Sequence, residues 1–140
     1  MGTATMTEAS INNPSKPVLG VAEPQLFVSD IRASCDFYQE KLGFRVRFVY
    51  GEPPFYAQVV RDAARLSLRH VDSPLVDAQL RAEQDLLSAT VVLDDPEALF
   101  QEYQGKGVPF HRLLRSEAWG ARNFIVADPD GNLIAFSGGG

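Results

Sequence analysis

The sequence predicts an α+β fold made of two βαβββ repeats within one domain. An apolar segment followed by a capping aspartate occurs twice, since Asp95 lies 65 positions after Asp30, and Tyr103 lies 65 positions after Tyr38 on the helices that follow. Each predicted helix is followed by three apolar or alternating segments, which are typical of strands. Neither repeat can bury its sheet alone, so the two must pack together and leave a concave sheet surface, where ligands usually bind.

The first repeat is predicted to span residues 21–70. Pro24 begins a short strand, at a position that tolerates its missing N–H, and Ser29 or Asp30 caps a helix that ends at Gly43. The helix is expected to bury one face, made by Ile31, Cys35, Tyr38 and Leu42. Three strands are expected after it, at residues 44–50, 55–61 and 65–70.

The first of these three strands alternates between apolar residues and arginine. Successive side chains of a strand point to opposite sides, so the pattern predicts a half-buried strand. The side expected to be buried carries Phe44, Val46, Phe48 and Tyr50, and the other side carries Arg45 and Arg47.

The second repeat is predicted to span residues 87–137. It follows a polar linker at residues 71–86, which has only a weak helical pattern around residues 76–81. A strand at residues 87–93 leads into a helix capped by Asp94 or Asp95. Pro96 is at its first position, where proline is favoured because its missing N–H would have no helical partner.

A strand at residues 108–114 and a hairpin at residues 119–136 complete the second repeat. The hairpin is expected to turn at Asp128–Asn132, where proline fixes φ, the aspartates can accept bonds from nearby N–H groups and glycine tolerates positive φ. Trp119 and Gly120 open the hairpin. From residue type alone, we expect Trp119 to anchor the core and Gly120 to form a bulge.

Composition narrows the class of protein. The net charge of −5 and the lack of a basic stripe argue against a nucleic-acid partner, and no apolar run is long enough to span a membrane. The single cysteine, Cys35, rules out an internal disulfide framework and favours a cytoplasmic location. Residues 1–20 are expected to be a flexible tail and residues 138–140 a flexible end.

Two motifs resemble a known superfamily over about residues 21–137. The first is D-x-x-x-S-x-x-F-Y-x-x-x-L-G-F from Asp30 to Phe44, and the second is W-G with D-P-x-G-N from Trp119 to Phe136. They resemble the vicinal oxygen chelate superfamily, which includes glyoxalase I, fosfomycin-resistance enzymes, extradiol dioxygenases and bleomycin-resistance proteins. The second motif looks most like the bleomycin-resistance branch. This resemblance implies a half-open β-barrel cleft and a homodimer.

The resemblance also implies where a metal would bind. Catalytic members hold a divalent ion with residues of the first, fourth, fifth and eighth strands. The matching positions here are Glu23, Ser67 or Leu68, Ser88 and Ala135. Only Glu23 is a plausible ligand, and one carboxylate cannot hold a transition metal usefully. We therefore expect no metal, no other cofactor and no catalytic residue, and we lean against an enzyme.

In bleomycin-resistance proteins, paired subunits sequester a flat cationic drug in grooves at their interface. Stacking surfaces and carboxylates are needed for such a ligand. The residues expected to bind a small aromatic or cationic molecule are Phe48, Tyr50, Phe55, Tyr56, Glu117, Trp119 and Arg122. The competing interpretation is that these aromatic residues belong to the core and that the acids are solvated surface charges. Arg122 could bind a ligand carboxylate or pair with a surface acid.

Three functions remain open from the sequence. The leading one is a metal-free, small-molecule-sequestering dimer. The alternative is a glyoxalase-type lyase, transferase or dioxygenase that uses one divalent metal ion held by Glu23 and His70, which lies close to the fourth-strand position. The third is a structural or regulatory dimer whose cleft is simply packed core.

Overall fold

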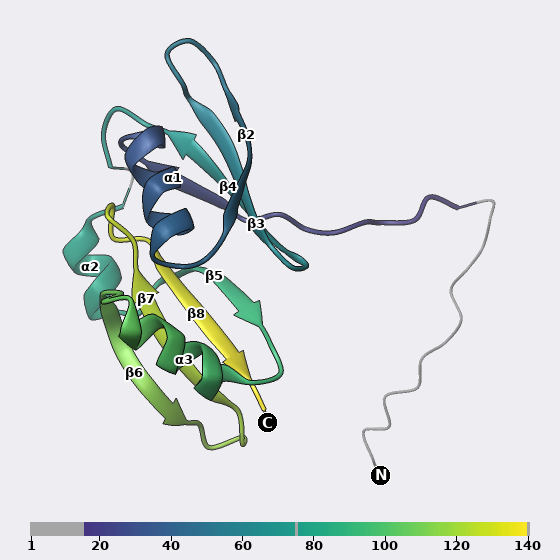
Figure 1. Ribbon diagram of the computed structural model, residues 1–140, viewed down its shortest axis with the longest axis vertical. Helices are drawn as coiled ribbons and strands as arrows, with labels where there is room; N and C mark the ends of the chain where they lie inside the picture. The colour runs from purple at the N-terminus through teal and green to yellow at the C-terminus, as the bar shows by residue number, and fades with distance from the viewer. Residues whose placement is uncertain (1–15, 75, 140) are drawn as a thin grey trace.

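The computed structural model describes residues 16–74 and 76–139 of the chain. The first repeat forms one four-stranded sheet and the helix that covers it (Figure 1). Its elements are β1 (Gln25–Val28), α1 (Ile31–Glu40), β2 (Arg45–Tyr50), β3 (Tyr56–Arg61) and β4 (Ala64–His70). The strand order is β1-β4-β3-β2, with β1 parallel to β4 and the other pairs antiparallel.

The second repeat has the same topology. A short helix, α2 (Ala78–Glu83), lies in the linker before it. The repeat itself contains β5 (Leu87–Val92), α3 (Pro96–Gly105), β6 (Phe110–Ser116), β7 (Arg122–Ala127) and β8 (Leu133–Gly138). Its strand order is β5-β8-β7-β6, with β5 parallel to β8. The prediction of an α+β fold with two βαβββ repeats is confirmed. Among the described residues, no helix is long and apolar enough to cross a membrane.

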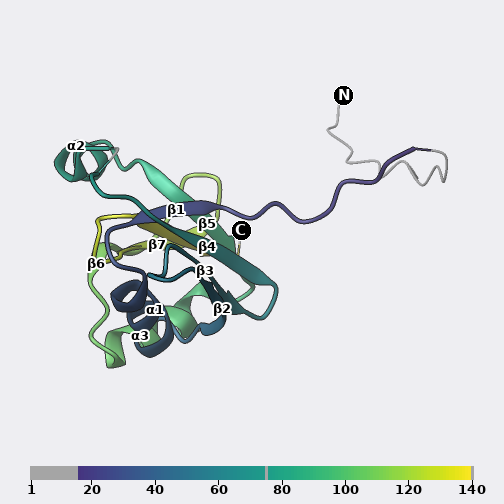
Figure 2. The ribbon, with the colours of Figure 1, turned by 90° about the horizontal axis from the view of Figure 1, so that it is seen from above.

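Both long helices begin at the predicted aspartates. The Asp30 carboxylate accepts a bond from the Ala33 N–H at 3.1 Å, and the Asp95 carboxylate accepts one from the Ala98 N–H at 3.0 Å. Each cap satisfies one of the N–H groups that a helix start leaves without a helical partner. Both helices lie on the same side of the strand layer (Figure 2).

The core lies between these helices and the two sheets, and both repeats contribute to it. Tyr38, Tyr103, Phe124 and Phe136 are among its fully buried side chains. The Phe124 and Phe136 rings stack with centroids 5.3 Å apart, and Tyr103 meets the Phe136 ring edge-on at 5.5 Å. One continuous apolar cluster therefore joins the repeats into a single folded unit.

Buried polar contacts also join the repeats. The Tyr38 hydroxyl donates to Asp128 Oδ2 at 2.8 Å, and the Tyr103 hydroxyl donates to the Leu42 carbonyl at 2.7 Å. Burial raises the pKa of Tyr38, and the neighbouring Asp128 carboxylate raises it further. Arg61 donates to both carboxylate oxygens of Glu102, at 2.8 and 3.0 Å. Each contact links an element of one repeat to an element of the other.

Trp119 does not anchor the core, and that prediction was wrong. It is 74% exposed and lies in the turn between β6 and β7. The Glu117 N–H donates to the Ala121 carbonyl at 2.7 Å and the Gly120 N–H donates to the Glu117 carbonyl at 2.9 Å, so these residues close a turn before β7 begins. Gly120 supplies the positive φ of this turn, +99°, and is not a bulge.

The burial predicted for β2 was also wrong. Phe44 is buried just before the strand, but Phe48 is 38% and Tyr50 65% exposed. A register shift between Val46 and Phe48 interrupts the alternation. After this bulge, Phe48 and Tyr50 lie on the side of the sheet that no helix covers.

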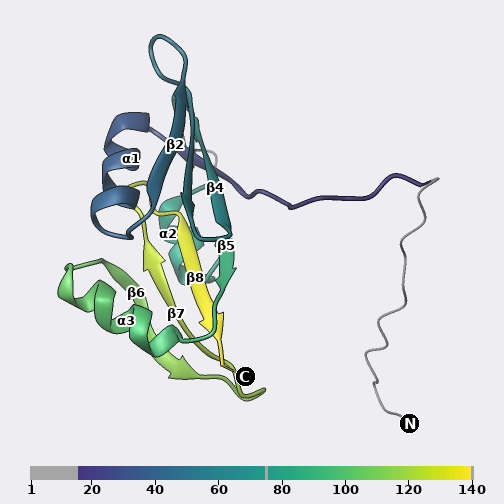
Figure 3. The same ribbon diagram turned by 45° about the vertical axis from the view of Figure 1, so that its right-hand side comes forward.

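Several boundaries differ slightly from prediction. β6 begins and ends two residues later than expected, at Phe110 and Ser116, and β8 reaches Gly138 because this residue pairs with Arg122. Residues 16–24 contain no helix or strand, and Val18, Leu19 and Val21 are exposed; the first part of this segment runs away from the body of the molecule (Figure 3), whereas Glu23 and Pro24 contact the first sheet. The rest of the predicted tail, residues 1–15, lies outside the described residues.

Candidate functional site

The outer face of the first sheet is the side turned away from α1. Alternation along β3 and β4 defines it. Ala57 and Val59 lie in the core, so Tyr56 and Gln58 point outward, and Leu66 and Leu68 in the core likewise place Ser67 outward. No acid occurs in the four strands of this sheet.

The structure brings together four of the residues predicted to bind a ligand. Tyr50 is opposite Tyr56 in the β2–β3 register. The Phe48 and Tyr56 rings are 5.9 Å apart between centroids, and the Tyr50 and Phe55 rings are 5.5 Å apart. We call Phe48, Tyr50, Phe55 and Tyr56 the aromatic group. It lies at the end of β2 and the start of β3, partly open to solvent.

A polar network fills the middle of the same face. The Gln58 side chain, only 2% exposed, donates from Nε2 to Glu23 Oε1 at 2.9 Å and to Ser67 Oγ at 3.4 Å. Its Oε1 accepts a hydrogen bond from Arg47. Arg65 donates to the other Glu23 oxygen at 3.4 Å. A buried amide that bonds at both ends holds the neighbouring side chains in fixed positions.

Sequence reasoning missed Gln58 and Arg47. Gln58 is the only polar residue between Tyr56 and Arg61, and that interruption of an apolar strand was an available signal. Alternation placed Arg47 on the side away from the core, but the bulge that brings Phe48 to the same side cannot be identified from alternation alone.

The residues at the predicted metal positions do not form a ligand set. Glu23 is bonded to Gln58, and Ser88 Oγ donates to Asn132 Oδ1 at 3.1 Å. Ala135 pairs with Thr90 and has no donor atom. Among residues 16–74 and 76–139, no group of three or more His, Cys, Asp and Glu side chains could hold a metal ion.

The structure also separates the two residual metal candidates. Gln25, which follows Glu23 by two residues, pairs with Ser67, whereas His70 pairs with Val28 at the far end of β1. At about 3.3 Å per residue, Glu23 and His70 are roughly 16 Å apart along the strand. His70 Nε2 instead lies 2.9 Å from the Asp72 carboxylate.

The other three predicted ligand residues lie at the opposite end of the molecule, around the turn between β6 and β7 (Figure 1). Glu117 accepts from Arg115 Nε at 2.9 Å, and this bond holds the pKa of Glu117 below its usual value. Arg122 pairs with Glu97 of α3, on the helix side of the second sheet. Trp119 is exposed between them. One chain therefore does not bring these residues to the aromatic group.

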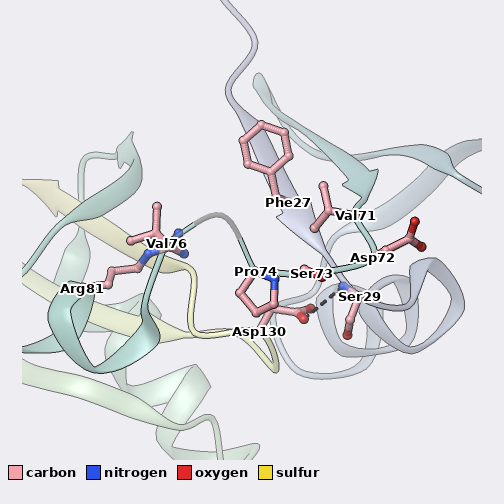
Figure 4. A pocket seen from close by; sticks show the side chains of 9 residues that line it. All are labelled: Phe27, Ser29, Val71, Asp72, Ser73, Pro74, Val76, Arg81 and Asp130. Atoms are coloured by element: carbon pink, nitrogen blue, oxygen red, sulfur yellow. Dashed lines mark hydrogen bonds between the residues drawn. The ribbon is translucent and has the colours of Figure 1, made fainter.

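A small pocket lies beside the outer face, between β1, the linker and the turn after β7 (Figure 4). Its volume is about 50 Å³, and its lining includes Phe27, Arg81 and Asp130. The Ser29 N–H donates to Asp130 Oδ1 at 3.0 Å and closes one side. The pocket is far smaller than the several hundred Å³ of a typical drug site.

Comparison with known proteins agrees with this fold. The family model of the Glyoxalase/Bleomycin resistance protein/Dioxygenase superfamily matches residues 20–136. A bleomycin resistance protein of Geobacillus stearothermophilus is 31% identical over 124 residues, which cover 81% of this chain and 92% of the relative. The bleomycin-binding protein of bleomycin-producing Streptomyces verticillus, solved with copper(II)-bleomycin, is 25% identical with a TM-score of 0.70, covering 89% of this chain and all of that one.

The bleomycin resistance determinant encoded on transposon Tn5 has the same fold, with a TM-score of 0.69 at 19% identity over 86% of this chain and 98% of its own. The family match spans most of the sequence, and the repeated βαβββ topology accounts for it structurally. The chain belongs to the Glyoxalase/Bleomycin resistance protein/Dioxygenase superfamily.

Proposed function

We propose that this protein binds a small aromatic molecule on the outer face of its first sheet and sequesters it without a reaction. The observation that carries the proposal is the exposed aromatic group, in which Phe48 and Tyr50 lie where no helix covers the sheet. Rings at a sheet surface suit stacking against a planar ligand. The similarity to a bleomycin resistance protein and to a bleomycin-binding protein supports a drug-like ligand.

Binding without a metal ion is supported by the contacts of the donor groups. The one carboxylate at the family's metal positions, Glu23, is already engaged by Gln58 and Arg65. Ser88 bonds to Asn132, and Ala135 offers no donor. A divalent transition metal would have to break this network and would gain only one charged ligand.

We also propose that the protein acts as a homodimer. The aromatic group and Trp119 lie at opposite ends of one chain, and a two-fold axis perpendicular to the line between these ends places one end of a subunit beside the opposite end of its partner. Exposed apolar side chains are available at both ends, including Tyr50 and Trp119. In this arrangement, Glu117 and Trp119 of the partner subunit would complete the groove over the aromatic group. Light scattering during gel filtration is expected to give the mass of two chains.

Calorimetric titration with bleomycin, after dialysis of the protein against EDTA, tests the sequestering function. Saturable binding is expected to survive the dialysis, and mass spectrometry is expected to recover bleomycin unchanged. Tyr50→Leu should weaken binding, whereas Val92→Ser, which changes another exposed apolar residue on β5, should not. A bound metal whose removal abolishes binding, or a modified ligand, would contradict the proposal in favour of a metal-dependent enzyme.

A further inference from the structure

The outer face of the first sheet has a charge opposite to that of the whole chain. The chain has a net charge of −5, yet β1 to β4 contain arginines and no acid. One of these arginines, Arg61, lies on the helix side and is paired with Glu102. The others are Arg45, Arg47, Arg65 and Arg69.

These four arginines lie on the same face as the aromatic group. Arg69 is opposite Tyr56 in the β3–β4 register, and Arg45 is opposite Val60. Both positions alternate with core residues, so their side chains leave the sheet on its outer side. Arg65 and Arg47 are placed there directly by their bonds to Glu23 and Gln58.

Glu23 is the only acid bonded to these arginines within the described part of the chain. It pairs with Arg65 at 3.4 Å, and the partner of Arg47 is a neutral amide. Arg45 and Arg69 form no ion pair with any described residue. Four guanidinium groups and one carboxylate leave the face with an excess of positive charge.

The bulge in β2 brings one of these charges beside the rings. Arg47 follows the core-side residue Val46 and therefore points to the outer side, where Gln58 holds its guanidinium; the register shift after Val46 turns Phe48 to this same side. The Arg47 Cζ atom lies 5.8 Å from the centroid of the Phe48 ring. An arginine fixed by one bond still has several N–H donors in a planar fork, which matches the geometry of a carboxylate or phosphate.

We infer that this face is selective for planar aromatic anions. The ring of such a ligand stacks on Phe48 and Tyr56, while its carboxylate, sulfonate or phosphate accepts bonds from Arg47, with Arg69 adding charge. The inference rests on the proposed function, because it names the ligand class of the same surface. A cationic ligand placed on these rings would instead face four guanidinium groups, so we expect a cationic drug such as bleomycin to bind this face more weakly than an aromatic anion does.

Three probes of one shape and different charge test the inference: 2-naphthoate, 2-naphthalenemethanol and 2-naphthylmethylammonium. Calorimetry with the full chain is expected to give tightest binding for the anion and weakest for the cation. Added salt should weaken binding of the anionic probe most, because screening reduces its attraction to the arginines. Bleomycin is titrated in parallel as the reference ligand for the proposed function.

Two variants locate the charge that matters. Arg47→Gln is expected to weaken 2-naphthoate about tenfold or more, because a charge-assisted bidentate contact is lost, and to leave 2-naphthalenemethanol within about twofold. Arg69→Gln removes a charge with no described ion-pair partner, so it should reduce anion affinity severalfold without disturbing the Gln58 network. Arg32→Gln, at an exposed position of α1 on the helix side of the sheet, is the matched control and should change neither affinity. Melting temperatures report whether each variant is folded.

Every outcome distinguishes the inference from the proposed function. Equal or tighter binding of the ammonium probe would overturn the anion selectivity and leave the aromatic binding surface intact. Equal effects of Arg47→Gln, Arg69→Gln and Arg32→Gln would overturn it too, since attraction to the whole molecule would explain them. Bleomycin binding with no binding of 2-naphthoate would also count against it. If neither bleomycin nor any probe binds, the proposed function fails as well.

Discussion

The two repeats have the same topology but different outer faces. The first sheet presents rings and arginines around Gln58. The second sheet buries a small separate apolar cluster, Ile125, Leu133 and Ala135, and α2 lies on this side of the strand layer (Figure 2). The two outer faces therefore differ in kind: one carries rings and arginines, and the other carries a small buried apolar cluster.

The contacts that join the repeats differ in a similar way. The matching tyrosines of the two helices donate to different acceptors: Tyr38 to the buried Asp128 carboxylate, and Tyr103 to the Leu42 carbonyl. Asp128 also accepts bonds from the N–H groups of Asp130 and Asn132. The first contact is part of a buried network, whereas the second is one bond to an oxygen that Arg61 also contacts.

The largest effect is expected from Asp128→Ala. This change leaves the Tyr38 hydroxyl and two N–H groups of the β7–β8 turn without their acceptor, and we expect a loss of about 3 kcal/mol in the free energy of unfolding. Urea denaturation measures it. Asp62, in the corresponding turn of the first repeat, has a positive φ that asparagine also tolerates. Asp62→Asn should therefore lower the free energy of unfolding by less than about 0.5 kcal/mol. Equal losses of stability in Asp128→Ala and Asp62→Asn would contradict the difference proposed between the two turns.

Phe48→Leu tests the contrast between the open face and the far end of the chain. Loss of the ring is expected to weaken bleomycin binding about tenfold, because stacking and ring contact area disappear. Trp119→Leu should weaken binding by a comparable factor only if a partner subunit brings that ring into the groove. Titration calorimetry of both variants compares them. Unchanged affinity for Phe48→Leu would contradict a site on the first sheet.

Tyr103→Phe should have a smaller effect on stability than Tyr38→Phe. Tyr103→Phe removes one hydrogen bond to the Leu42 carbonyl, which still accepts a bond from Arg61. A loss of about 1 kcal/mol in the free energy of unfolding is therefore expected. Tyr38→Phe removes a donor from the buried Asp128 carboxylate, so a larger loss of about 2 kcal/mol in the free energy of unfolding is expected. Paired urea denaturation curves measure the difference, and the reverse order would show that the two tyrosines have been ranked wrongly.

The smallest expected effect is the change in stability at low pH that depends on Glu102. Bonds from Arg61 lower the pKa of Glu102, so its contribution to stability is complete above about pH 4.5 and is lost as pH falls through the lowered value. Burial raises the pKa of Asp128, so the effect of this group has the opposite pH dependence. Its contribution to stability decreases as pH rises from about 3.8. Glu102→Gln should lower the melting temperature by about 2 °C at pH 7 and by less at pH 3. If Glu102→Gln lowers the melting temperature equally at pH 3 and pH 7, the lowered pKa assigned to Glu102 is contradicted.

Local signals explain what could be predicted from sequence. The capping aspartates, the glycine at each helix end and the turn at Asp128–Asn132 depend on neighbouring residues, and the 65-residue spacing of the tyrosines revealed the repeat. Exposure depends instead on which side of a sheet receives a helix. Alternation could not show that Phe48 and Tyr50 lie on the uncovered side, and residue type could not show that Trp119 lies in a turn. The grouping of Arg47 with Phe48 on one face required a bulge that the sequence pattern does not indicate.

The position of Trp119 has a spectroscopic consequence. It is the chain's single tryptophan, and its indole is mostly in water at one end of the molecule. Intrinsic emission excited at the red edge of absorption therefore reports only that end. A separate subunit should emit at long wavelength and be quenched readily by iodide, and an indole covered by a neighbouring copy would shift to the blue and resist quenching.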